Sequence, residues 1–141
     1  MSDMKSRDTL LKLKRFQVDE KRRQAAQIES MIAEFERMAG DLDREIAQEQ
    51  ERAGIHDVAH YAYPTYAKAA KVRRDNLMRS ADELRGQLAD AQAALAEAFE
   101  ELKKIEILEE RDTAREKLAE AARDQAEMDR IGLTPVELRA S

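Results

Sequence analysis

The chain has 141 residues and a net charge of −5, and Ala, Glu, Lys, Leu and Arg supply 80 of its residues. Such a composition is typical of long helices and coiled coils. Because it has no Cys or Trp and only six aromatic residues, we expect no layered sheet, large core, disulfide scaffold, metal site, cofactor or catalytic pocket.

Glycine and proline are so rare that two long helical patterns remain uninterrupted. Between them, Gly54 suits the left-handed position that ends a helix, and Pro64 suits the first turn of the next helix. No run of about 18 apolar residues occurs, so we expect a cytoplasmic chain without a membrane span or secretory signal. The predicted organisation is a single domain, 1–141, with a first helix at about 8–53, a loop at 54–64, a second helix at about 65–131 and a flexible tail at 132–141.

Apolar residues recur at alternating spacings of three and four in both helical patterns. The first helix carries this apolar seam from Val18 to Ile46, and the second carries it from Leu77 to Ile105. Narrow seams of this length are typical of coiled coils rather than of globular helices. Because the loop is short, the helices should fold back on each other. The predicted fold class is all-α, a long antiparallel two-helix coiled-coil hairpin whose second helix is longer than the first.

The register of the hairpin can be predicted from its charged seam positions. If the residue numbers of facing positions sum to 123, Glu49 faces Arg74 and Lys14 faces Glu109. Opposite charges at these positions would discriminate against slipped pairings. A shift by one heptad, to a sum of 116, sets Arg74 and Lys14 against leucines instead. We therefore prefer the sum of 123.

Near the start of the chain, Leu10, Leu13 and Phe16 lie off the seam. Two interpretations remain open: the C-terminal tail folds back over these side chains, or they form a docking surface for a partner protein. Basic residues surround them, but acidic residues interrupt the basic run and the chain is net acidic. We therefore do not expect nucleic-acid binding.

Three of the six aromatic residues gather around the loop, as Tyr61, Tyr63 and Tyr66. Their rings either close the end of the coiled coil by packing on it or form a contact site beside the basic start of the second helix. The two interpretations are compatible. His56 and His60 are four residues apart but have no Cys or third His nearby, so we expect no metal site there.

Three stretches carry a family likeness. They are MKSRDTLLKLKRFQVDEKRRQ near the start, AHYAYPTYAKAAKVRRDNL across the loop, and ALAEAFEELKK in the second helix. Together with the chain length, the basic first helix and the longer second helix, they resemble the flagellar export protein family FliJ, in the form found in alphaproteobacteria. The likeness extends from Met4 to Ile131 and contains no catalytic signature.

The resemblance implies a non-enzymatic component of the flagellar type III export apparatus. As a stalk, it would dock in the ring of the export ATPase FliI, link the ring to the export gate FlhA, and also meet FliH and export chaperones. Membrane association, at the inner face of the cell membrane, would then occur through partners only. By this analogy we expect the ATPase contact at Leu13, Lys14, Phe16, Arg22, Arg111 and Arg115, and the gate contact at Tyr63, Tyr66 and Arg73.

An isolated stalk is expected to be a monomer. The alternative function is a homo-oligomeric coiled-coil scaffold or adaptor, in which the apolar faces pair with another copy of the chain. The resemblance favours the stalk.

Overall fold

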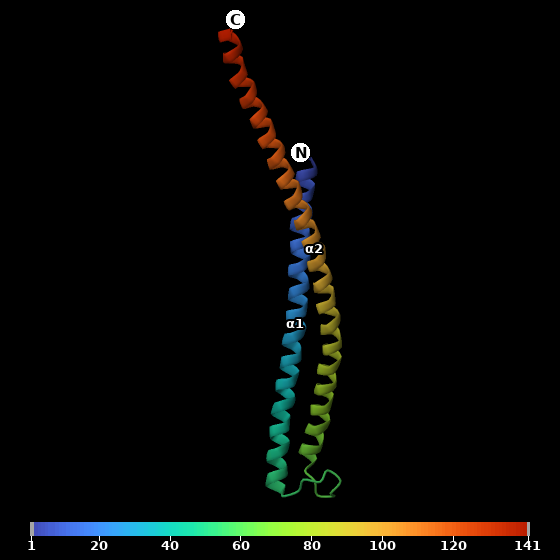
Figure 1. Cartoon of the computed structure of the whole chain (residues 1–141). Coiled ribbons are helices and arrows are strands. Elements are labelled where there is room, and N and C mark those ends of the chain that lie inside the picture. The colour runs from blue at the N-terminus through green and yellow to red at the C-terminus, as the bar shows by residue number, and fades with distance from the viewer. Residues whose placement is uncertain (1, 141) are drawn as a thin grey trace. The chain divides into compact units, whose positions relative to one another are not determined.

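The computed structural model describes residues 2–140, and it describes the side chains of residues 5–132. Two helices, α1 (Ser2–Ala53) and α2 (Thr65–Ala140), make up the described chain together with the loop between them, and none of the described residues is in a strand (Figure 1). The predicted all-α fold with a longer second helix is confirmed. Residues 132–140 of the expected flexible tail, 132–141, form the end of α2. Residue 141 and the side chains after Gly132 lie outside the described residues.

Local backbone chemistry sets the two helix ends at the loop. Gly54 has φ of 69°, and its N–H donates to the carbonyl of Gln50 at 2.8 Å. The N–H of Ile55 donates to the same carbonyl at 3.3 Å, which is the pairing of a glycine-capped helix C-terminus. At the start of α2, the N–H of Lys68 donates to the carbonyl of Pro64 at 3.1 Å. Proline suits this first turn because its missing N–H has no helical partner there.

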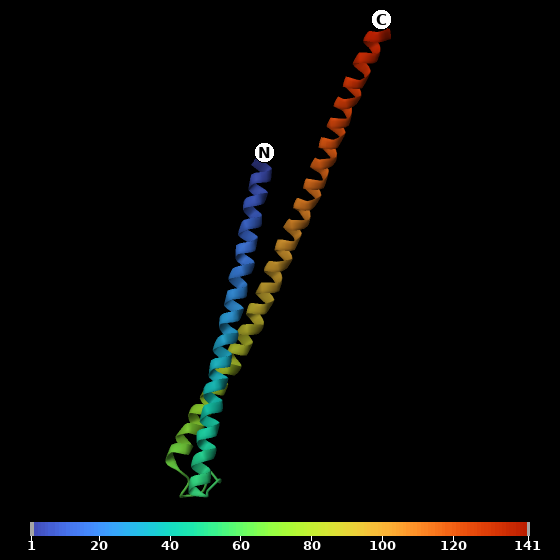
Figure 2. The ribbon, with the colours of Figure 1, turned by 90° about the vertical axis from the view of Figure 1, so that its left-hand side faces the viewer.

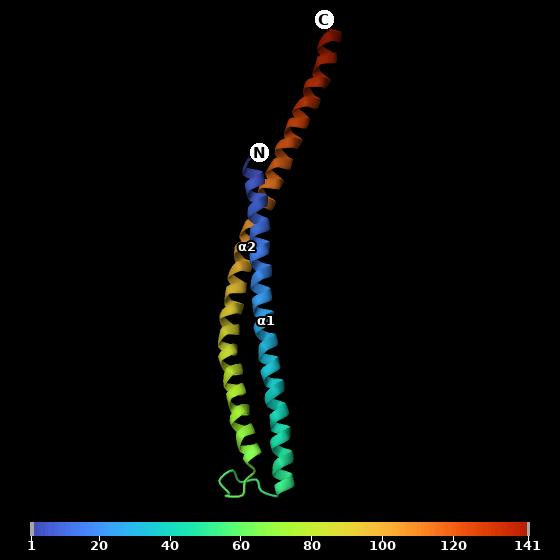
Figure 3. The ribbon, with the colours of Figure 1, turned by 180° about the vertical axis from the view of Figure 1, so that it is seen from behind.

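The contacts divide the chain into two compact units. One unit spans Phe16–Phe99, and the other consists of the start of α1 up to Arg15 together with α2 from Glu100 onward. Within Phe16–Phe99 the two helices run side by side in opposite directions (Figures 1 and 3). Its buried side chains are Val18, Ala25, Ile32, Ala39, Leu42, Ile46, Tyr63, Ala67, Ala70, Ala81 and Leu84.

The helices meet one heptad away from the predicted register. In the unit Phe16–Phe99, Arg74 Nε donates to Asp43 Oδ1 at 3.0 Å. The predicted register would set Arg74 against Glu49, but Glu49 pairs with Arg52 of its own helix at 3.0 Å. The sum of 123 is therefore wrong, and the sum of 116 describes this unit.

Small residues at the start of α2 explain the shift. Ala67 and Ala70 continue the spacing of three and four ahead of Arg74, and both are buried in one cluster with Ile46. The predicted seam omitted them because it started at Leu77. Arg74 can occupy a seam position because its long side chain extends out of the seam. The side chain is 36% exposed, and its guanidinium reaches solvent and the carboxylate of Asp43.

The second unit has the same register. Lys14 Nζ lies 2.8 Å from Glu101 Oε2, rather than meeting Glu109 as predicted. Beyond this contact, α2 continues past the start of α1 (Figure 2). All described side chains from Thr113 to Gly132 are exposed. No helix in the described part of the chain is long and apolar enough to cross a membrane.

Two helical glycines in Phe16–Phe99 are expected to be stability defects. A Cβ at Gly86 would meet no atom within 4 Å, and a Cβ at Gly40 would meet only Arg44 Nη1, at 3.9 Å. Gly40→Ala and Gly86→Ala should each raise the free energy of unfolding by about 0.5–1 kcal/mol, because alanine loses less backbone entropy in a helix. Gly54→Ala should lower it by about 1 kcal/mol, because the residue has positive φ. Urea denaturation followed by circular dichroism measures all three, and destabilisation by Gly86→Ala would contradict this account.

The loop tyrosines should differ sharply in their effect on stability. Tyr63 is 8% exposed, packs in the cluster with Leu42 and Ile46, and its hydroxyl accepts a hydrogen bond from Gln50 Nε2 at 2.9 Å. Tyr63→Ala should cost about 3 kcal/mol, because it leaves a cavity in this cluster. Tyr61 is 96% exposed, so Tyr61→Ala is the matched control and should change stability by less than about 0.5 kcal/mol. Equal effects of the two variants in the same denaturation experiment would show that Tyr63 does not close the coil.

Candidate partner-binding surfaces

One of the two histidines, His60, has structural contacts within the loop. His60 Nδ1 accepts the N–H of Ala62 at 3.0 Å, and its ring stacks on Tyr61 with centroids 4.7 Å apart. No group of three or more His, Asp or Glu side chains in the described range is arranged to hold a metal ion. The surfaces described next contain the residues for which the sequence predicts contacts with partner proteins.

Four of the expected ATPase contacts lie in the unit formed by the start of α1 and the later part of α2. Leu13 is 49% exposed, and Arg111 and Arg115 are also exposed. Lys14 is engaged within the chain, because its ammonium donates to Glu101. That hydrogen bond and the positive charge beside it lower the pKa of the Glu101 carboxyl. Leu13, Arg111 and Arg115 thus remain open to a partner, whereas Lys14 already holds α1 against α2.

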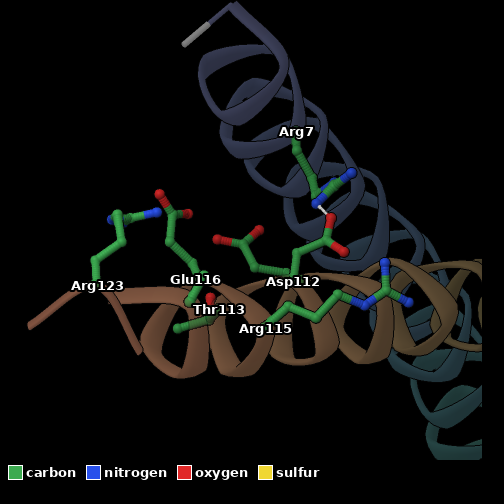
Figure 4. A pocket seen from close by; sticks show the side chains of 8 residues that line it. Arg7, Asp112, Thr113, Arg115, Glu116 and Arg123 are labelled. Atoms are coloured by element: carbon green, nitrogen blue, oxygen red, sulfur yellow. Dashed lines mark ion pairs between the residues drawn. The ribbon is translucent and has the colours of Figure 1, made fainter. Parts of the chain in front are cut away.

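A charged hollow of about 440 Å³ lies in the same unit. Figure 4 shows Arg7 approaching from α1 and pairing with Asp112, while the other labelled side chains come from α2. Basic and acidic groups alternate around the hollow, which is lined by Arg7, Glu109, Asp112, Thr113, Arg115, Glu116, Ala119 and Arg123. Such a mixed lining suits the charged side chains of a partner protein better than a small ligand of one charge.

The other two expected ATPase contacts belong to the unit Phe16–Phe99. Phe16 is 57% exposed and Arg22 is exposed. The six expected residues are therefore distributed over two units, and each unit offers its own apolar and basic side chains. The alternative interpretation is that the C-terminal tail covers Leu13 and Phe16. It depends on tail side chains after Gly132, which lie outside the described residues.

The expected gate contacts differ in accessibility. Tyr63 is buried and supports the loop, whereas Tyr66 is 56% exposed and Arg73 is exposed. The hydroxyl of Tyr66 donates to Glu45 Oε2 at 2.7 Å. This hydrogen bond to a carboxylate, together with the negative charge of Glu45, raises the pKa of Tyr66. A buried packing residue, Tyr63, and two exposed side chains, Tyr66 and Arg73, thus occur close together in the sequence here.

Sequence reasoning missed an exposed apolar series in the later part of α2. Leu118 is 72% exposed, Met128 is 68% exposed and Ile131 is 59% exposed. Ile107, Ala114 and Leu118 follow one another at intervals of seven and four residues, and they lie outside the seam positions. The sequence contains these apolar residues, but a search along the seam positions does not find them, because the seam positions carry polar residues in this part of the helix.

The comparison with protein families identifies the chain. The model of the family described as "Flagellar FliJ protein" matches residues 4–134, which is almost the whole chain. Among curated proteins and solved structures, no match to this chain was found. The match is to the family as a whole, so the expected alphaproteobacterial form stays a prediction. The chain belongs to the FliJ family and is thereby a non-enzymatic component of the flagellar protein export apparatus.

Proposed function

We propose that this chain acts as a stalk that docks in the ring of the export ATPase FliI and couples it to the export gate FlhA. Membership of the FliJ family is the observation that carries this proposal. It is supported by the exposure of α2 from Thr113 to Gly132, because exposed side chains are accessible to the inner surface of a ring. In this proposal the protein is cytoplasmic and reaches the membrane only through its partners, among them FliH and export chaperones.

The ATPase contacts are assigned to exposed residues in each of the two units, with Leu13, Arg111 and Arg115 in one unit and Phe16 and Arg22 in the other. Leu13 and Phe16 supply apolar area, and Arg22, Arg111 and Arg115 supply charge. Aromatic residues and arginine are enriched in protein interfaces. Lys14 contributes by fixing α1 to α2 through Glu101.

The gate contact is assigned to the start of α2. Tyr66 and Arg73 are the exposed groups, and tyrosine and arginine are favoured in interface hot spots. Tyr63 contributes by holding the loop against the coil, since its ring is buried there. The two contacts use different side chains, so they can be tested separately.

A crossed pair of variants tests the stalk. Arg111→Glu with Arg115→Glu should reduce binding to the ATPase at least tenfold, because each reversal places a like charge where the contact needs an opposite one. Tyr66→Ala with Arg73→Glu should weaken binding to the gate and leave ATPase stimulation unchanged. ATP hydrolysis, ring assembly and binding to the cytosolic part of the gate are measured for both.

Each double variant is the control for the other, and circular dichroism checks that both remain folded. If the wild-type chain changes neither hydrolysis nor ring assembly, the stalk proposal fails. If both variants impair both interactions equally, the assignment of separate contacts fails.

The homo-oligomeric scaffold is the second candidate, and the exposed series of Leu118, Met128 and Ile131 favours it. The stalk predicts a monomer of 16.1 kDa. Multi-angle light scattering across a range of concentrations distinguishes the two functions. A stable dimer or tetramer that Leu118→Ser with Met128→Ser converts to a monomer would support the scaffold and contradict the monomeric stalk.

A further inference from the structure

The start of α1 and the facing part of α2 form a helix pair with an unusually charged seam. We call this the terminal helix pair, defined as residues 5–15 of α1 and 100–112 of α2, all within one compact unit. The sequence spacing assigns seven seam positions to it, and four of these positions carry charge. The seven are Arg7, Leu11, Lys14, Leu102, Ile105, Glu109 and Asp112.

Little apolar surface holds this pair together. Leu11 is 4% exposed and Leu102 is 7% exposed, while Ile105 is only partly buried. The unit Phe16–Phe99, by contrast, buries eleven apolar side chains. Because apolar burial is the main source of coiled-coil stability, the terminal helix pair should be much less stable than the rest of the coil.

Long charged side chains span the terminal helix pair instead. Arg7 pairs with Asp112, and Lys14 Nζ lies 2.8 Å from Glu101 Oε2. The four side chains are between 22% and 46% exposed, so solvent and salt screen both pairs. In Figure 2 the two backbones of this unit diverge toward the N-terminal end of α1. The ion pairs therefore join two helices whose apolar contact is already ending.

One carboxylate inside the seam also opposes closure. Glu109 Oε2 is buried and has no hydrogen-bond partner among the described residues. A buried acceptor without a partner destabilises the closed arrangement, and separation of the helices would return it to water. The small buried apolar area, the screened ion pairs and this unpaired oxygen each indicate that the closed terminal helix pair has low stability.

We propose that the terminal helix pair is a salt-sensitive conformational switch that opens locally while the unit Phe16–Phe99 stays folded. Opening separates residues 5–15 of α1 from α2 and uncovers Leu11 and Leu102 beside Leu13, which is 49% exposed when the pair is closed. The closed pair hides this apolar surface, and the open pair presents it. This inference concerns the isolated chain and does not depend on the proposed stalk function.

Amide hydrogen exchange measured by mass spectrometry on the full chain tests the switch. Residues 102–112 give the cleanest signal, because they lie inside α2 and not at a fraying helix end. At about 50 mM salt their amides should exchange at least about tenfold faster than those of 77–91. Raising the salt to about 500 mM should accelerate exchange in 102–112 roughly threefold. Exchange in 77–91 should change much less, because the exposed Arg85–Glu36 pair there only adds to a buried apolar seam.

A matched pair of variants distinguishes the switch from simple fraying. Lys14→Leu would place a leucine beside Leu102 in the seam, so exchange in 102–112 should slow about tenfold. Its salt dependence should become weaker, because only the Arg7–Asp112 pair then remains. Lys103→Leu removes the same charge at an exposed position and should leave both properties unchanged. Glu109→Gln should slow exchange about threefold, because it buries a neutral group in place of a charge.

Several outcomes would overturn the proposal. These are equal protection of 102–112 and 77–91, an absence of salt dependence in the wild-type chain, and the same effect from Lys14→Leu and Lys103→Leu. If Lys14→Leu associates with itself, Glu109→Gln still decides, because it adds no apolar surface. Faster exchange in Glu109→Gln than in the wild-type chain would show that the carboxylate supports closure.

Discussion

The fold depends on one constraint, the burial of a narrow apolar seam between two helices. Each seam residue covers little surface alone, so stability requires a long series of them in register. In the unit Phe16–Phe99 this series runs from Val18 to Ile46 on α1 and includes Ala67 to Leu84 on α2. Where the series continues, the helices pack closely. Where charged residues replace it, ion pairs hold the helices together, and from Thr113 to Gly132 the described side chains of α2 are exposed.

Charged residues at seam positions limit how much of this chain packs as a coiled coil. Arg74 and Lys14 occupy seam positions, yet each reaches a carboxylate at the edge of the seam, Asp43 and Glu101 respectively. A long flexible side chain can do this at small cost, because only its methylene groups are buried. The same chemistry produces different results in the two units. Arg74 lies among buried neighbours, whereas Lys14 lies in a pair with few apolar contacts.

Much of the fold and part of the site could be predicted without the structure. Gly54 and Pro64 mark the ends of the helices because their backbone chemistry is local, and the structure places the loop between Ala53 and Thr65. The exposed candidates Leu13 and Phe16 lie off the seam, which spacing alone reveals. Tyr63 could not be distinguished from Tyr61 and Tyr66 in this way. Its burial depends on how the loop folds over Leu42 and Ile46.

The sequence by itself determined two long helices, the place where they reverse, and a resemblance that the family comparison confirms. These follow from residue spacing and backbone preferences, which act over a few neighbouring residues. Only the tertiary structure decided the register. Two pairings one heptad apart both align apolar residues, and the choice between them depends on Ala67 and Ala70 packing beside Ile46. The structure likewise decided which charged groups are paired across the helices, because such pairs join residues far apart in the chain.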